Sequence, residues 1–108
     1  MKFKINNLEW SIDYLGENDK KLNGTDWITF GLTECAMQTI TIRTGMSKEL
    51  TRETVIHELC HAFLFSTGNQ GSDGYTSEQL CNFFGSWADE IMKITDNFMQ
   101  NEQNEYEK

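Results

Sequence analysis

The stretch from Thr51 to Gly68 carries the only two histidines of the chain, His57 and His61, four residues apart, with Glu58 beside the first. Residues four apart lie on the same face of an α-helix, one turn above the other. Two imidazoles in that arrangement can bind one metal ion, and the neighbouring glutamate can reach a water molecule on that ion. The pattern therefore requires a helix, and it indicates the zinc site of a hydrolase.

Signals at both ends of this stretch predict the limits of the helix. Ser47 is suited to cap a helix that runs from position 48 to about 67, and Gly68 is suited to end it. Apolar residues surround the motif on most sides, which predicts a buried helix. A buried imidazole or carboxylate needs a partner. A metal ion is the simplest partner for all three polar groups of the motif.

The segment before this helix predicts a small sheet. Alternating apolar and polar residues indicate two short strands within residues 2–14, with a turn at Asn6-Asn7. Aromatic and β-branched residues predict a third strand at 27–30. Residues 31–36 are expected to form a turn or irregular link. The clearest strand is 37–43, in which Ile40 and Ile42 share one face.

A second long helix is expected after the first. A glycine-rich loop spans Gly68 to Tyr75, and Thr76 with Gln79 then makes a capping box. The polar, mostly acidic tail 101–108 is expected to fray into solvent. Apolar residues at helical spacing predict a stripe that faces the core: Leu80, Phe84, Trp87, Ile91, Ile94 and Phe98.

The whole chain, residues 1–108, is expected to form one α+β domain, with a sheet of three or four strands followed by two packed helices. Its net charge of −8 argues against nucleic acid as a partner. The sequence shows no apolar run that could cross a membrane and no secretory signal. Three cysteines, an odd number, fit reduced thiols in a cytoplasm. Of these, Cys60 and Cys81 are expected to be small core residues.

A catalytic zinc ion usually has three protein ligands and one open position. Because the chain has no further histidine, the third ligand must be a carboxylate, a cysteine or a tyrosine. Glu78 is our choice, since it falls in the first turn of the second helix, where a carboxylate is favoured and where the chain can fold back. Asp73 is the second candidate. Less favoured candidates are Cys35, Asp89 and Glu90.

These residues resemble the ImmA/IrrE-type zinc peptidases and the short zincin-like proteins of phages and prophages. The active helix of that family reads His-Glu-Leu-x-His-Ala, as residues 57–62 do here. The strand sequence at 38–42 is similar as well, and the resemblance covers roughly residues 31–88. A later helix of the family begins with a glutamate three residues before a small residue, often followed by asparagine and phenylalanine. This chain has the same spacing, with a cysteine where the family commonly has alanine: Glu78, Cys81, Asn82 and Phe84.

The resemblance implies zinc bound by His57, His61 and Glu78, with Glu58 as the general base of a metallopeptidase that acts on a peptide or protein substrate. In zincins the strand before the active helix offers an edge to an extended peptide, which makes 37–43 the candidate strand here. The loop from Gly68 to Tyr75 is a candidate lid, and Tyr75 is a candidate hydrogen-bond donor to the oxyanion.

A second interpretation is a zincin-fold protein that is not an enzyme. In that case zinc staples a small domain that binds a host or phage protein. An open fourth position on the metal favours the enzyme, and four protein ligands favour the staple. A purely structural acidic domain without metal leaves the motif unexplained. A site of two histidines and a carboxylate also accepts iron, cobalt or manganese.

Overall fold

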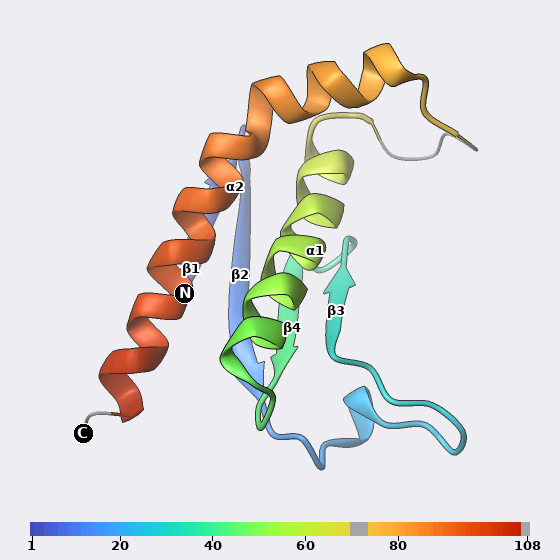
Figure 1. Cartoon of the computed structure of the whole chain (residues 1–108). Helices are drawn as coiled ribbons and strands as arrows, with labels where there is room; N and C mark the ends of the chain where they lie inside the picture. Colours follow the sequence, from blue (N-terminus) through green and yellow to red (C-terminus); the bar gives the residue numbers. More distant parts are fainter. Residues whose placement is uncertain (70–73, 107–108) are drawn as a thin grey trace.

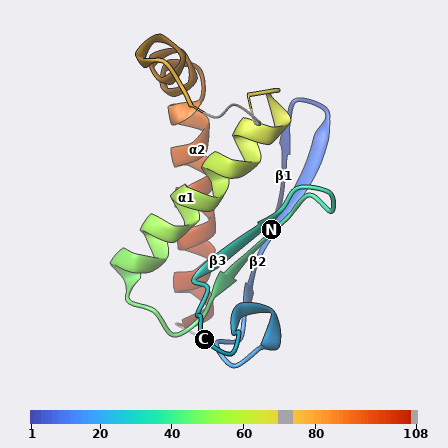
Figure 2. The same ribbon diagram turned by 90° about the vertical axis from the view of Figure 1, so that its right-hand side faces the viewer.

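The strand-forming and helix-forming segments build one sheet with two helices packed against it. The structure, a computed structural model, describes residues 1–69 and 74–106, with side chains described up to Asn101. Both helices lie on the same side of the sheet (Figure 1, Figure 2). This arrangement confirms the predicted α+β fold. The elements, in chain order, are β1 (Lys2–Ile5), β2 (Leu8–Leu15), the short 3-10 helix η1 (Lys20–Leu22), β3 (Gly31–Glu34), β4 (Thr39–Arg43), α1 (Lys48–Ser66) and α2 (Ser77–Tyr106).

The sheet has the strand order β1-β2-β4-β3. β1 and β2 form an antiparallel hairpin, as predicted for residues 2–14, and Asn6 in its turn has φ 54°, a left-handed conformation that asparagine tolerates. β2 pairs with β4 in parallel, and β4 pairs with β3 antiparallel. The predicted strand at 37–43 is confirmed, with β4 beginning two residues later. It lies inside the sheet, because β2 and β3 flank it.

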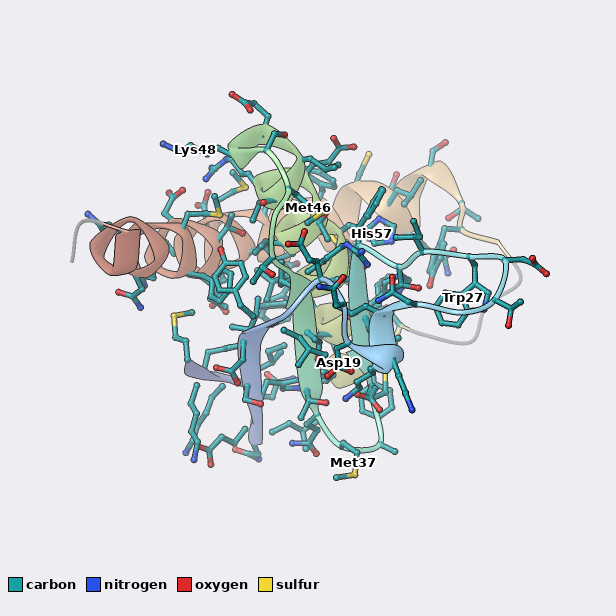
Figure 3. All side chains as sticks on the ribbon, turned by 90° about the horizontal axis from the view of Figure 1, so that it is seen from below. Asp19, Trp27, Met37, Met46, Lys48 and His57 are labelled. Atoms are coloured by element: carbon teal, nitrogen blue, oxygen red, sulfur yellow. The ribbon has the colours of Figure 1, made fainter. Side chains whose placement is uncertain are left out.

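The predicted third strand at 27–30 is wrong, because the strand in this region is β3, four residues further on. Trp27, Ile28 and Phe30 are exposed, in a segment that leaves the sheet (Figure 3). Their aromatic and β-branched character favours a strand only where a neighbouring strand is available to pair with it. The register with β4 instead selects Gly31–Glu34, which lacks that composition.

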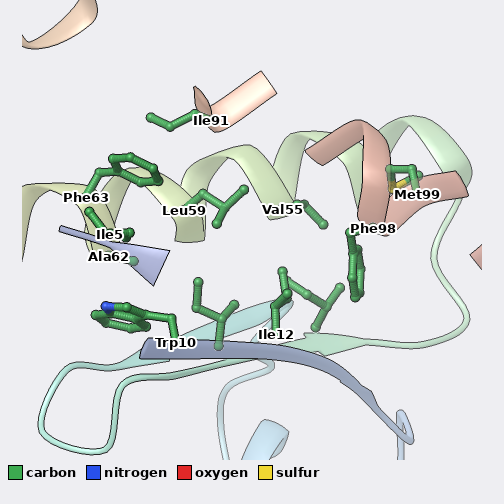
Figure 4. Close-up of a cluster of buried hydrophobic side chains, with 12 residues drawn as sticks. Ile5, Trp10, Ile12, Val55, Leu59, Ala62, Phe63, Ile91, Phe98 and Met99 are labelled. Atoms are coloured by element: carbon green, nitrogen blue, oxygen red, sulfur yellow. The ribbon is translucent and has the colours of Figure 1, made fainter. Parts of the chain in front are cut away.

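The core lies between the sheet and α1, with the second half of α2 closing its side. Ile40 and Ile42 point inward from β4, as predicted. Figure 4 shows the side chains of α1 facing those of β2, with α2 contributing from the flank. A T-shaped Trp10–Phe65 contact and a stacked Tyr14–Phe98 pair extend this packing. The buried cluster consists of Ile5, Trp10, Ile12, Ile40, Ile42, Val55, Leu59, Ala62, Phe63, Ile91, Phe98 and Met99.

The predicted limits of α1 are confirmed by its capping contacts. The Ser47 side chain accepts a hydrogen bond from the backbone N–H of Leu50 at 3.1 Å. At the other end Gly68 has φ 77°, and Gly68 and Asn69 donate to the carbonyls of Phe65 and Leu64. These two bonds form a Schellman motif, which requires a left-handed residue where the glycine stands.

The course of α2 differs from the prediction in several ways. Figure 1 shows its first half crossing the end of α1 and then bending downward beside the sheet. The sequence of α2 contains Gly85-Ser86, and a Gly/Ser pair is a usual cause of a helix kink. As a result Leu80 and Phe84, predicted as core, are 51% and 67% exposed. Cys81, also predicted as core, is exposed.

The end of α2 also departs from the prediction of a fraying tail. The helix continues to Tyr106, although the segment from 101 onward is polar. The capping box at its start is confirmed, since Thr76 and Gln79 exchange hydrogen bonds of 2.9 and 3.1 Å. Within the residues that the structure describes, no helix is long and apolar enough to span a bilayer.

Candidate metal and catalytic site

The two histidines of the motif lie side by side on the exposed face of α1. The ring centroids of His57 and His61 are 4.9 Å apart, and the rings meet at 74°. The His57 side chain is 66% exposed, and His61 is exposed as well. The expectation that the whole motif is buried is therefore wrong for the imidazoles. Figure 3 shows His57 on the same side of the molecule as the segment that carries Trp27.

Glu58 is buried, in contrast to the histidines, because it points from α1 toward β3. Its side chain is 8% exposed. The Thr33 hydroxyl donates to Glu58 Oε1 at 2.8 Å and also lies 3.2 Å from the Glu58 backbone carbonyl. The other carboxyl oxygen, Glu58 Oε2, lies 3.7 Å from His57 Nε2. The Thr33 hydroxyl thus holds one oxygen of the carboxyl group, and the second oxygen lies toward His57.

A close approach of β3 to α1 brings Thr33 within reach of Glu58. A Cβ added at Gly31 would lie 2.7 Å from Thr54 Cγ2 and 2.8 Å from Glu58 Cγ. Only glycine fits this approach without displacing a neighbour. The sequence interpretation missed both Gly31 and Thr33, because it treated 31–36 as a link. The alternation in Gly-Leu-Thr-Glu is too short a signal to have identified them.

A pocket of about 360 Å³ opens beside these groups. The pocket lies between the beginning of β3 and one face of α1, so that the buried Glu58 carboxyl and the exposed His57 border the same space. The lining combines apolar and polar side chains, which suits a peptide rather than a purely hydrophobic ligand. The lining residues are Phe30, Gly31, Leu50, Glu53, Thr54, His57 and Glu58.

The position of the sheet edge corrects one further expectation. Residues 37–43 were expected to offer an edge to a peptide, but β4 is paired on both sides. In the described part of the chain the edge beside α1 belongs to β3. The Arg43 N–H donates to the Phe30 carbonyl at 2.9 Å. In an antiparallel ladder this pairing turns the backbone groups of Gly31 and Thr33 toward the free edge.

The third expected ligand, Glu78, does not join the histidines. It is exposed in the first turn of α2, the half that crosses the end of α1. Among the side chains that the structure describes, in residues 1–69 and 74–101, no three of His, Cys, Asp or Glu come close enough together to hold a metal ion. Cys35, Asp89 and Glu90 therefore complete no such group either. Asp73 lies outside the described residues.

Two of the three expected metal ligands, His57 and His61, are thus placed together, and the third is not. Two imidazoles one helical turn apart are the pair that zinc binds in this motif. Cys60, next in sequence to His61, is a poor substitute for the missing donor. Burial raises the pKa of its thiol, which disfavours the thiolate that zinc requires.

Comparisons with protein-family models, with curated proteins and with solved structures find no significant match to this chain. The functional interpretation therefore depends on the motif and on the geometry of these residues.

Proposed function

We propose that this protein is a zinc-dependent peptidase that hydrolyses a peptide bond in a specific cytoplasmic protein. One observation carries the proposal. The exposed imidazoles of His57 and His61 lie side by side, and His57 lies next to the buried Glu58 carboxyl group, which Thr33 holds and which borders an open pocket together with His57. The resemblance to the ImmA/IrrE-type and phage zincin-like peptidases supports the same function.

In this proposal each residue of the motif has a separate task. His57 and His61 hold the metal. When bound, zinc supplies a Lewis acid that lowers the pKa of water and polarises a carbonyl. Glu58 Oε2 takes the proton of the attacking water and passes it to the nitrogen of the leaving amine. Thr33 is a positioning residue, because it holds Oε1 and so keeps Oε2 turned toward the reaction.

The free edge of β3 is the proposed binding site for the substrate backbone. An extended peptide can add a strand there by pairing with the backbone groups of Gly31 and Thr33. Such a strand runs past the pocket that Phe30, His57 and Glu58 line. Pairing with the backbone gives affinity, and the pocket selects among the side chains of the substrate.

Glu78 remains the proposed third ligand, on the basis of the resemblance. Because it is exposed on the first half of α2, it reaches the histidines only if that half moves relative to α1. Zinc affinity tests this directly. Glu78→Ala should weaken zinc binding, whereas Asp89→Ala should not, because Asp89 is an exposed carboxylate about three turns further along α2.

The main experiment measures zinc content and hydrolysis separately. Protein purified without a His-tag should contain about one zinc per chain, and His61→Ala should lose it. Glu58→Gln should keep the zinc and lower hydrolysis by about 100-fold or more, measured as new N-termini in a cytoplasmic protein extract. Full activity in Glu58→Gln would refute the mechanism. Absence of zinc from the unmodified protein, even after zinc is added, would refute the metal site.

A second candidate function is a zinc-stapled binding protein without catalysis. The observation that favours it is the exposed apolar surface of Leu80 and Phe84, which a monomer rarely leaves uncovered without a reason. Zinc retained by the unmodified protein, together with no hydrolysis of any component of the extract, would select this function over the peptidase.

A further inference from the structure

An apolar groove runs between α1 and the first half of α2, on the side of α1 away from Glu58. Two adjoining hollows of about 360 Å³ and about 80 Å³ form it. Both are lined by Cys60, Phe83 and Phe84, so they are continuous. None of the residues that line either hollow carries a charge. The groove is therefore distinct in chemistry from the pocket beside His57.

The rim of the groove exposes large apolar side chains at helical spacing along α2. Phe84 is 67% exposed, Leu80 is 51% exposed and Met92 is 37% exposed. Contact with water at each of these side chains costs free energy that burial would recover. The stretch from Leu80 to Met92 is about 18 Å long at 1.5 Å per residue, which is the length of about three helical turns.

The charge around the groove is mostly negative. From Glu53 to Met92 the sequence contains no lysine or arginine. Glu78, Asp89 and Glu90 are exposed on α2, each next in sequence to a residue that lines the groove. The groove is thus bordered by three carboxylates on α2 and by Lys93, which is exposed and next in sequence to Met92.

We propose that this groove binds an amphipathic helix of a partner protein whose apolar stripe is flanked by lysine or arginine. A helix in an apolar groove is a common mode of recognition, with anchors one turn apart. Opposite charges at the rim accelerate association and select the partner. A second copy of this chain is a poorer occupant, because a two-fold contact places the same patch of Glu78, Asp89 and Glu90 on both sides.

The test uses the full chain and a fluorescent peptide of about 16 residues, long enough for the three turns of the groove. The peptide has leucines at helical spacing and lysines elsewhere. A scrambled peptide of the same composition is the control for simple charge attraction. Fluorescence anisotropy should show tighter binding of the amphipathic peptide, weakened by added salt.

Phe84→Ser should weaken binding of the amphipathic peptide by about tenfold or more, as expected for a central apolar anchor. Met37→Ser is the matched control, because Met37 is also exposed but lies at the tip of the β3–β4 turn (Figure 3). It should leave binding unchanged. Since Phe84 is exposed, its replacement should leave the thermal unfolding temperature close to that of the unmodified protein.

Three results would overturn the proposal. The first is equal binding of the scrambled peptide, and the second is unchanged binding by Phe84→Ser. The third is a dimer in sedimentation experiments that Phe84→Ser dissociates, which would assign the groove to a second copy. His61→Ala should still bind the peptide, so a failure of the zinc site and a failure of the groove are distinguishable.

Discussion

Replacing Gly31 with alanine tests how closely β3 must approach α1. The new Cβ would lie 2.7 Å from Thr54 Cγ2 and 2.8 Å from Glu58 Cγ, whereas non-bonded carbon atoms are most stable at about 3.5–4.0 Å. Thr54 and Glu58 are both buried, and Thr33 holds the Glu58 carboxyl by a hydrogen bond, so displacing either side chain is costly. Relief therefore requires the strand to move outward by about 1 Å. Overpacking of this kind costs about 1–3 kcal/mol, which lowers Tm by about 5–15 °C.

The assay is thermal unfolding followed by circular dichroism, supported by urea denaturation. Gly16→Ala is the control, because a Cβ there meets no atom within 4 Å, and it should leave Tm nearly unchanged. Thr54→Ser removes the nearer of the two obstructing atoms, so it should restore part of the stability that Gly31→Ala loses. If Gly31→Ala unfolds within about 0.5 kcal/mol of the unmodified protein, the close approach of β3 to α1 is refuted.

Two further predictions concern single side chains near the site. Thr33→Val removes the hydroxyl that donates to the buried Glu58 carboxyl, so the free energy of unfolding should fall by about 1–3 kcal/mol in urea denaturation, whereas Thr33→Ser should retain most of it; equal stability of the two variants would contradict the role of the hydroxyl. Burial raises the pKa of the Cys60 thiol, so at pH 8 an alkylating reagent should modify the exposed Cys81 first. The rate at which Cys60 is modified, measured by mass spectrometry, should increase only as the pH rises above the ordinary thiol pKa of about 8.5. Equal rates of modification for Cys60 and Cys81 at pH 8 would contradict the raised pKa of Cys60.

The candidate site divides into a part that was predictable and a part that was not. His57, Glu58 and His61 share one helix, so helical periodicity alone predicts that the two imidazoles lie one turn apart. Thr33 comes from a strand that ends more than twenty residues earlier in the chain. Its contact with Glu58 depends on the pairing of β3 with β4, for which the local sequence holds no pattern.

The errors in the fold have the same origin. Residues 27–30 have the composition of a strand, but they pair with their neighbours only through isolated hydrogen bonds, and Trp27, Ile28 and Phe30 remain exposed. Leu80 and Phe84 continue the helical stripe of α2, but the bend of that helix directs them away from the sheet. In both cases a correct local pattern predicted burial that the tertiary arrangement does not provide.

Sequence alone determined the extent of α1, its caps at Ser47 and Gly68, the β1–β2 hairpin and the inward face of β4. Each of these depends on interactions between residues a few positions apart, or on a periodicity that a single element carries. Tertiary structure alone decided the identity of the edge strand, the burial of Glu58 beside exposed histidines and the distance of Glu78 from them. Those features depend on contacts between segments that are distant in sequence, and on the direction in which α2 leaves the end of α1.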